Sequence, residues 1–319
     1  MYGCHTTSTH RVTNTMKRTI TFSIVGVMLF FTCTAIISRR ALLYDRYTLS
    51  DTFPYRNEQR TLQLYKIDSV IELVMRATAK DEVAAVVDNY KNRNGNAALV
   101  TEFTIDRHGA IQDKFGVIRH QAAPLYRTTT DRSPERYARD GSLAIVIDSL
   151  PNNFIKAKSV AISGEWYIPK RYLRKLPNRN FKKFIIVDRK FQTITACERS
   201  DTGWWLRAAN PASTGIESPP YKRTTPLGIF IISDKVEKMM FLHDGSSAVA
   251  GFSPYASRFS GGAYIHGIPT NYPARNIIEW SHTLGTTPRS HMCVRCATSF
   301  ALWVYEWADC DSTVVAVIE

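Results

Sequence analysis

Residues 262–267 read Gly-Ala-Tyr-Ile-His-Gly, and residues 290–296 read Ser-His-Met-Cys-Val-Arg-Cys. His266 closes a short apolar run, and Cys293 follows another histidine by two positions. A cysteine attacks carbonyl groups as the thiolate, and a nearby imidazole can form and hold that thiolate. The two stretches therefore predict a thiol acyl-transfer site, with Cys293 as the nucleophile and His266 as the base.

The surroundings of the thiol suggest how the site is built. An apolar pattern over 297–307 predicts a helix, so Cys293 is expected on a loop just before it. A helix N-terminus would lower the thiol pKa. The backbone amides of Met292 and Cys293 are candidates for an oxyanion hole.

The C-terminal part of the chain has the pattern of a β-rich domain. Alternating and continuous apolar runs predict strands and turn-fed strands on both sides of His266. We place this domain at 179–319, with one short helix after the cysteine motif. The expected strands cover 183–188, 192–196, 225–232, 238–242, 262–266 and 313–318.

The segments before residue 179 predict two further parts and an α+β, multidomain fold. Apolar residues recur at helical spacing near 64–75 and again near 83–90, which predicts a helical hairpin within 41–95, after a linker. From 96 to 178 the period drops towards two, which predicts a small β-domain. Its expected strands cover 98–105, 110–118, 143–148 and 158–168.

The N-terminal tail, residues 1–40, contains an apolar run at 19–38 with basic residues on both sides. The run is long enough to cross a bilayer, and it also resembles a signal peptide. A membrane anchor, a cleaved signal and a lipoprotein attached at Cys33 stay open. All three predict export to the periplasm or cell envelope, with an inner-membrane anchor favoured.

The charge of the chain favours anionic partners. Its 319 residues have a formal net charge of +13, with 44% hydrophobic and 22% charged residues. Such a surface suits nucleic acid, acidic lipid or a polyanionic cell wall. The basic residues are scattered and no nucleic-acid-binding module is recognisable, so we expect no nucleic-acid partner.

The motifs together resemble the L,D-transpeptidase (YkuD-type) catalytic domain. That family has His-Gly or His-Ser, a spacer, and then Ser/Thr-His-Gly-Cys-x-Arg/Asn, which compare with 266–267 and 290–295. It also has Thr-Pro-x-Gly-x-Phe, which compares with 225–230, and an opening strand and turn like 185–195. The resemblance implies a β-sandwich domain that needs no metal or organic cofactor.

The resemblance also implies residue roles and a substrate. Cys293 would be the nucleophile, His266 its base, and the Gly267 carbonyl would orient the imidazole. Ser290, His291 and Arg295 would shape the loop and contact substrate, with Met292 beside the oxyanion. The partners would be peptidoglycan stem peptides and the cell-wall polymer. Attack at the third-residue carbonyl would release D-Ala and pass the acyl group to an amine. An L,D-carboxypeptidase and a non-catalytic wall-binding protein are the alternatives.

A second resemblance concerns the small β-domain. Residues 123–126 and 164–173 are similar to the opening and ending of bacterial SH3-type domains. This similarity implies a wall-binding or positioning module ahead of the catalytic domain.

Two departures and one rival interpretation accompany the family resemblance. Met292 stands where the family has glycine, which is costly if the position needs a positive φ. His266 and Cys293 are 27 positions apart (293 − 266), a long spacer whose extra residues, around 271–286, could form a lid or a substrate wall. The Cys-x-x-Cys spacing of Cys293 and Cys296 also fits thiol–disulfide exchange or half of a zinc site.

Overall fold

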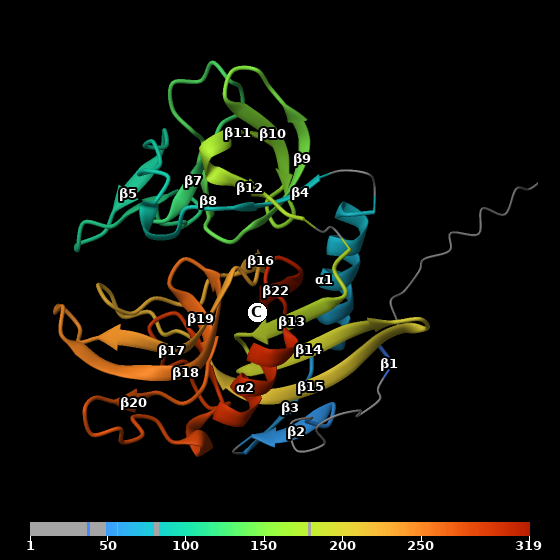
Figure 1. The fold of residues 1–319 in the computed structure, drawn as a ribbon, viewed down its shortest axis with the longest axis vertical. Helices are drawn as coiled ribbons and strands as arrows, with labels where there is room; N and C mark the ends of the chain where they lie inside the picture. The colour runs from blue at the N-terminus through green and yellow to red at the C-terminus, as the bar shows by residue number, and fades with distance from the viewer. Residues whose placement is uncertain (1–36, 39–48, 56, 80–82, 178–179) are drawn as a thin grey trace, which may run out of the picture. The chain divides into compact units, whose positions relative to one another are not determined.

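The computed structural model describes residues 37–38, 49–55, 57–79, 83–177 and 180–319. In this part the protein is mostly β, with few helices (Figure 1). The apolar run at 19–38 lies outside the described residues except for β1 (Ile37–Ser38), a short strand that pairs with the large sheet. Within the described residues, no helix has the length and apolar character needed to cross a membrane.

An eleven-stranded sheet forms the C-terminal part of the chain. Two of its interior strands, β13 (Lys183–Asp188) and β22 (Thr313–Ile318), are parallel and almost wholly buried, as their continuous apolar runs require. β1 joins β15, and β20 (Thr270–Asn271) joins β18. The main path runs β16 (Gly228–Ile231), β22, β13, β14 (Thr193–Ser200), β15 (Gly203–Ser213), β21 (Val294–Cys296), β19 (Ala263–His266), β18 (Val249–Ser260) and β17 (Asp234–Leu242).

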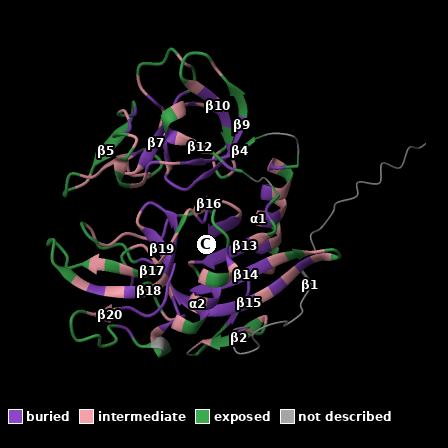
Figure 2. Ribbon diagram, in the orientation of Figure 1, coloured by how far each residue is buried: buried purple, intermediate pink, exposed green. Residues whose placement is uncertain are grey.

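Successive side chains of β13 enter different cores, because strand residues alternate between faces. Ile185 packs in a cluster with helix α2 (Thr298–Trp307), whereas Ile186 packs in a second cluster with helix α1 (Leu64–Ala77). The first cluster also contains residues of β18 and β19, so both halves of the sheet share it. In Figure 2 most of β13 and β19 is coloured as buried. The shared core fixes β19 and β21, the two strands that hold the candidate site.

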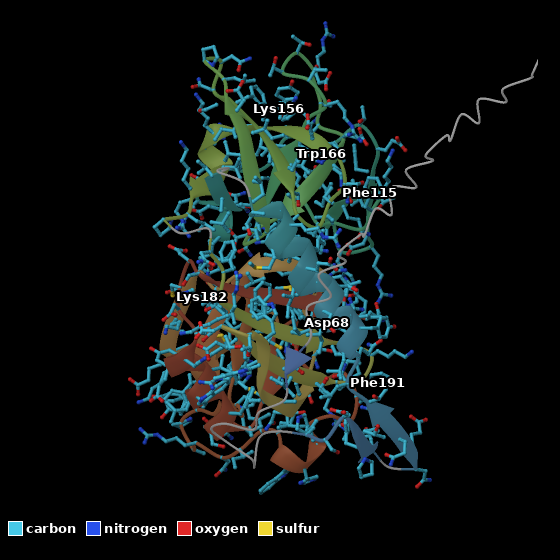
Figure 3. The ribbon with its side chains drawn as sticks, turned by 90° about the vertical axis from the view of Figure 1, so that its right-hand side faces the viewer. Asp68, Phe115, Lys156, Trp166, Lys182 and Phe191 are labelled. Carbon is cyan, nitrogen blue, oxygen red and sulfur yellow. The ribbon has the colours of Figure 1, made fainter. Side chains whose placement is uncertain are left out.

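A separate five-stranded sheet precedes the large one. Its order is β11, β10, β9, β4 and β12, with Trp166 buried in its core (Figure 3). Three two-stranded hairpins complete the described strands. The sheet strands are β4 (Val83–Val87), β9 (Leu143–Ser149), β10 (Phe154–Ser159), β11 (Glu165–Pro169) and β12 (Leu173–Lys175). The hairpins pair β2 (Thr52–Tyr55) with β3 (Glu58–Thr61), β5 (Phe103–Ile105) with β6 (Ile111–Asp113), and β7 (Ala122–Leu125) with β8 (Arg136–Arg139).

The predicted helical hairpin is wrong in its second half. The first helix exists as α1, but 83–87 is strand β4, which pairs with β9 and β12. The segment Val-Ala-Ala-Val-Val is rich in β-branched residues, and its last four residues are buried, so it suits the middle of a sheet better than a helix surface. The sheet therefore uses a strand from before residue 96. The domain divisions near 40, 95 and 178 stay predictions.

Another strand prediction is corrected in the same sheet. The segment 158–168 was expected to be one strand, but it contains the end of β10, a turn, and most of β11. Gly164 in that turn has φ +96, a conformation that favours glycine. Because only a short turn separates β10 from β11, the apolar residues of the two strands form one continuous pattern in the sequence.

Candidate active site

The parallel pairing of β19 with β21 brings the two predicted reactive residues together. Ile265 pairs with Val294, and both are buried in the core. Because strand side chains alternate, His266 and Cys293 project from the other face. They line a common pocket of ≈ 410 Å³ that also takes side chains from β17 and from Tyr90. The sequence expectation that these residues share a crevice agrees with this arrangement.

His266 is held as a neutral base. Its Nδ1 lies 2.7 Å from the carbonyl oxygen of Gly267, which can only accept, so Nδ1 carries the hydrogen and Nε2 carries the lone pair. Burial lowers the pKa of His266 to about 4, a change that the Gly267 carbonyl opposes and the Arg295 cation adds to. The imidazole is therefore uncharged at neutral pH.

Gly267 is positioned by close packing. Its N–H donates to the Pro254 carbonyl at 2.9 Å. A Cβ at this position would lie 2.9 Å from Pro254 Cγ and 3.0 Å from Thr298 Cα. A side chain here would therefore force Pro254 or Thr298 to shift, so glycine suits the position that places the carbonyl at the His266 ring.

Cys293 is a half-buried thiol that favours its protonated form in the resting site. Burial raises the pKa of Cys293, while a backbone hydrogen bond from Tyr264 and the charge of Arg295 oppose that rise. The sulfur donates to the Gly262 carbonyl at 3.5 Å. A neutral thiol next to a neutral imidazole needs a general-base step at the moment of attack, rather than a preformed ion pair.

The expected contribution of a helix to the Cys293 thiol is wrong. Strand β21 follows Cys293 directly, and α2 begins only at Thr298. The helix dipole falls off within its first turn, so it does not reach the sulfur. The apolar signal of α2 was correct, but the three residues of β21 are too few to be recognised in a sequence.

Met292 adopts the backbone conformation for which the family uses glycine. Its φ is +138, and its carbonyl accepts from Thr225 Oγ1 at 2.8 Å. The Met292 N–H donates to Ser290 Oγ at 3.3 Å, so this candidate oxyanion donor already has a partner in the resting site. Such strain costs about 1–3 kcal/mol and persists only where neighbours fix the backbone.

The other predicted site residues divide into structural and pocket-lining positions. Ser290 is buried, and its hydroxyl donates to the Cys293 carbonyl, which shapes the loop. His291 is exposed at the pocket, with Nε2 2.9 Å from Asp244 Oδ1. Arg295 lines the pocket and forms an ion pair with Glu279.

Glu279 is an important residue that the sequence did not reveal. It is buried within the long spacer, where it pairs with Arg295 and accepts from Thr283 Oγ1 at 3.0 Å. Its sequence context, Ile-Ile-Glu-Trp, gives no motif that indicates a partner. The pair fixes the spacer to β21, and Ile278 beside it becomes part of the pocket wall.

Two residues of the segment before His266 were also missed. Gly262 supplies the carbonyl that accepts from the thiol, and Tyr264 supplies the backbone hydrogen bond to it. Tyr264 lies two positions before His266 on the same strand, so the period of two could have placed it on the pocket face.

The rival cysteine interpretations receive no support from the geometry. Cys296 is completely buried in the core with Val294, on the opposite face of β21 from Cys293. The four cysteines of the described residues are all free thiols. In that same part of the chain, no group of three or more metal-ligating side chains could hold a metal ion.

The segment that contains the candidate site matches a known protein family. Residues 182–317 match the family model YkuD, the L,D-transpeptidase catalytic domain. This segment is a YkuD domain. The match includes both stretches that define the candidate site as well as β13, β22 and most of the large sheet. A comparison with curated proteins finds no match.

Several solved structures are similar to the chain. An L,D-transpeptidase from Mycobacterium smegmatis is 12% identical, with a TM-score of 0.36 over 62% of this chain and 99% of that one. An L,D-transpeptidase from Mycobacterium tuberculosis H37Rv is 17% identical, with a TM-score of 0.33 over 63% and 77%. A fused Zn-dependent amidase/peptidase/peptodoglycan-binding domain-containing protein from Clostridium acetobutylicum is 20% identical, with a TM-score of 0.32 over 45%. The chain spans 54% of the length of that protein.

Proposed function

We propose that the protein is a peptidoglycan L,D-transpeptidase that uses Cys293 as its nucleophile. The observation that supports this most is the shared pocket of His266 and Cys293 within a YkuD domain. The donor would be a tetrapeptide stem, cleaved at the third-residue carbonyl, and the acceptor an amine of a neighbouring stem.

The neutral resting pair determines the order of proton transfers. As the sulfur of Cys293 bonds to the carbonyl carbon, Nε2 of His266 takes the thiol proton. The C–N bond to D-Ala then breaks, and the imidazolium gives that proton to the departing amine. The acceptor amine attacks the thioester, loses a proton to His266 and expels the sulfur, which leaves a thiol again. No step requires a metal ion or an organic cofactor.

The low pKa of His266 suits the second half of this sequence. A buried imidazolium with a pKa of about 4 is a stronger acid than an exposed one, so it protonates the leaving amine readily. The Arg295 cation lowers the pKa of the Cys293 thiol, which favours loss of its proton. The same cation disfavours the imidazolium, which favours the later proton transfer from His266 to the leaving amine.

The proposed activity also implies a cellular location and a role for the five-stranded sheet. The chain would work in the periplasm or cell envelope, held at the inner membrane by its N-terminal segment. The net charge of +13 suits the anionic wall polymer. The five-stranded sheet would be an SH3-like module that binds or orients the wall.

A carbapenem tests the nucleophile directly. The intact mass of the protein should increase by one drug molecule, and peptide mapping should place the adduct on Cys293. Cys293→Ser should abolish the adduct, whereas Cys310→Ser, which removes an exposed thiol, should retain it. An unmodified wild-type protein would favour the non-catalytic wall-binding alternative.

Purified stem peptides then separate the two enzymatic outcomes. Incubation with a tetrapeptide donor and an amine acceptor should give a crosslinked dimer and free D-Ala by mass. Release of D-Ala with only the tripeptide product would identify an L,D-carboxypeptidase instead. Neither product, with Cys293 intact, would contradict both activities.

A further inference from the structure

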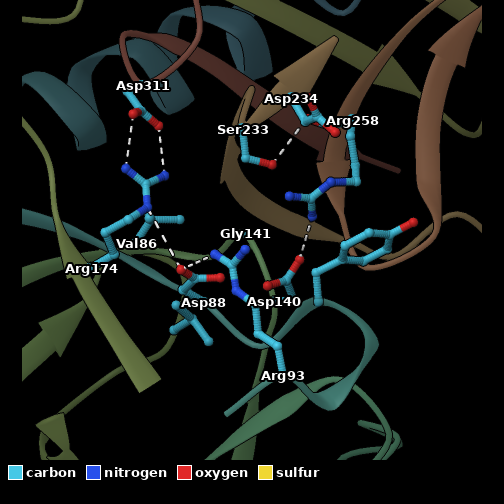
Figure 4. A pocket seen from close by; sticks show the side chains of 12 residues that line it. Val86, Asp88, Arg93, Asp140, Gly141, Arg174, Ser233, Asp234, Arg258 and Asp311 are labelled. Atoms are coloured by element: carbon cyan, nitrogen blue, oxygen red, sulfur yellow. Dashed lines mark hydrogen bonds and ion pairs between the residues drawn. The ribbon is translucent and has the colours of Figure 1, made fainter. Parts of the chain in front are cut away.

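A buried carboxylate connects the five-stranded sheet to the segment that contacts the thiol. Asp140 lies between β8 and β9 and is almost fully buried, as is its partner Arg258 on β18. Figure 4 shows the two side chains facing each other across the pocket between the sheets. Arg258 Nη1 lies 2.8 Å from Asp140 Oδ2.

The same carboxylate holds the backbone on both sides. Its Oδ1 accepts from the Asn89 N–H at 2.7 Å, and its Oδ2 accepts from the Gly261 N–H at 3.0 Å. The Asp140 carbonyl also accepts from Ser260 Oγ at 2.8 Å. The carboxylate itself thus accepts from three donors: Arg258 Nη1 and the N–H groups of Asn89 and Gly261. These donors compensate the negative charge that burial removes from water.

Gly261 is one residue from the group that contacts the thiol. The Gly262 carbonyl accepts from Cys293 Sγ at 3.5 Å, and Gly262 lines the candidate pocket. The neighbouring chains are in close contact, because a Cβ on Gly141 would lie 1.9 Å from the Phe259 carbonyl oxygen. A displacement of Asp140 would therefore also displace the backbone of residues 259–262.

A second contact reaches the site from the same region. Tyr90, which follows β4, has its hydroxyl 3.2 Å from that of Tyr264, and both tyrosines line the candidate pocket. The Arg258 guanidinium lies over the Tyr90 ring, 4.2 Å from its centroid. Asp140, Arg258 and Tyr90 thus form one connected group behind the pocket.

We propose that Asp140 is a positioning residue for Cys293, which acts by fixing Gly261 so that the Gly262 carbonyl holds the thiol in place. The catalytic consequence rests on the proposed function, but the effect on the thiol does not. The five-stranded region then serves as a structural part of the active site as well as a separate module.

A second ion pair between the sheets provides a matched control. Arg174 on β12 binds Asp311 with two hydrogen bonds, at 2.8 and 2.7 Å, and neither residue contacts 259–262 in the described interactions. Asp311 has φ +64, which asparagine tolerates well. Asp311→Asn should therefore weaken a contact between the sheets while it leaves the hydrogen bonds of Asp140 to Arg258 and Gly261 in place.

The test is the rate at which iodoacetamide alkylates each cysteine of the full chain, followed by peptide mass mapping. Asp140→Asn should raise the alkylation rate of Cys293 at pH 7 about fivefold, the size expected for one lost hydrogen bond to the neutral thiol. The pH profile of this alkylation should move to lower pH. The charged and titratable groups that bear on it are Arg295 near the thiol and His266 in the same pocket, and, around Asp140, Arg258, Asp88 and Arg174. Asp311→Asn should match the wild type.

Cys197 and Cys296 report on unfolding in the same sample, because both are completely buried. Their alkylation should stay at the wild-type rate in Asp140→Asn. The double variant Asp140→Leu/Arg258→Met removes both buried charges and avoids an unpaired cation. It should regain stability yet still show fast Cys293 alkylation, since Gly261 has lost its acceptor.

The outcomes separate this proposal from the proposed function. An unchanged Cys293 rate in both Asp140 variants would overturn the positioning role, and so would a parallel increase at Cys197 and Cys296. A wild-type protein without stem-peptide turnover would instead count against the proposed function, and the alkylation rates would still decide the role of Asp140. With turnover present, Asp140→Asn should lower kcat about tenfold with little change in KM, as expected when a reacting group is misplaced.

Discussion

His266 and Arg295 are register partners in the parallel ladder between β19 and β21. The guanidinium is thereby held near the imidazole, and Glu279 in the spacer forms an ion pair with it. Because burial and this cation both disfavour the imidazolium, His266 stays neutral over most of the physiological pH range. The pairing makes both stability and reactivity depend on pH in a way that can be measured.

Protein stability should decrease as the pH falls from 6.5 to 4. In the unfolded chain His266 binds a proton below about 6.5, but in the folded protein it does so only near 4. Between these values the unfolded state binds more protons, so the free energy of unfolding falls by up to about 3 kcal/mol. Urea unfolding of His266→Gln should show a smaller decrease than the wild type.

The acylation rate should have no inflection near the ordinary histidine pKa. A base with a pKa of about 4 is available throughout pH 5.5–7, so kcat/KM should be level there and should fall only as the pH approaches 4. The rate of carbapenem adduct formation, followed by mass between pH 4 and 7.5, measures this. An inflection centred near 6.5 would show that the imidazole is more solvated than the structure indicates.

Loss of the Glu279 carboxylate should release the spacer. Glu279→Gln leaves the mostly buried Arg295 cation without its counter-charge, which should cost about 3 kcal/mol. Hydrogen exchange across 271–286 should accelerate relative to the wild type. Glu217→Gln is the control, since that carboxylate pairs with Arg223 at a largely exposed position and should change stability by less than about 0.5 kcal/mol. Equal losses of stability in the two variants would contradict the role of Glu279 in fixing the spacer.

A methyl group at Gly215 should disturb the backbone under Cys293. A Cβ there would lie 2.2 Å from the Arg223 carbonyl oxygen and 2.7 Å from Met292 Cα, so the backbone must move. Gly215→Ala should lower the free energy of unfolding by about 2 kcal/mol or more and slow adduct formation at Cys293. At Gly262, the nearest atom to an added Cβ is the end of the Met292 side chain, at 3.6 Å. Gly262→Ala should therefore be milder by thermal unfolding.

The sequence was most informative where one apolar face of a helix or one continuous apolar run of a strand determines the structure. The apolar runs of β13 and β22 predicted buried strands, and the helical spacing of 297–307 predicted α2. His266 at the end of an apolar run was correctly expected at a strand end. In each case local pattern and tertiary position agree, so no long-range information was needed.

The failures have a common physical cause. Residues 83–87 form a strand because β9 and β12 lie on either side of it, which no local pattern records. Glu279 and Asp140 matter through partners 16 and 118 positions away in the sequence. The sequence shows Met292 at a position where the family has glycine, but only the structure shows that the loop there has a positive φ.

The place of β22 between two other strands has a consequence for how the protein folds. β22 lies between β16 and β13, yet it comes last in sequence among the described strands. Until residues 313–318 have left the ribosome, β13 lacks its parallel neighbour and the hydrophobic centre stays open. Assembly of the YkuD domain must therefore wait until β22 is available to pair with β13 and β16, so the large sheet forms late in synthesis.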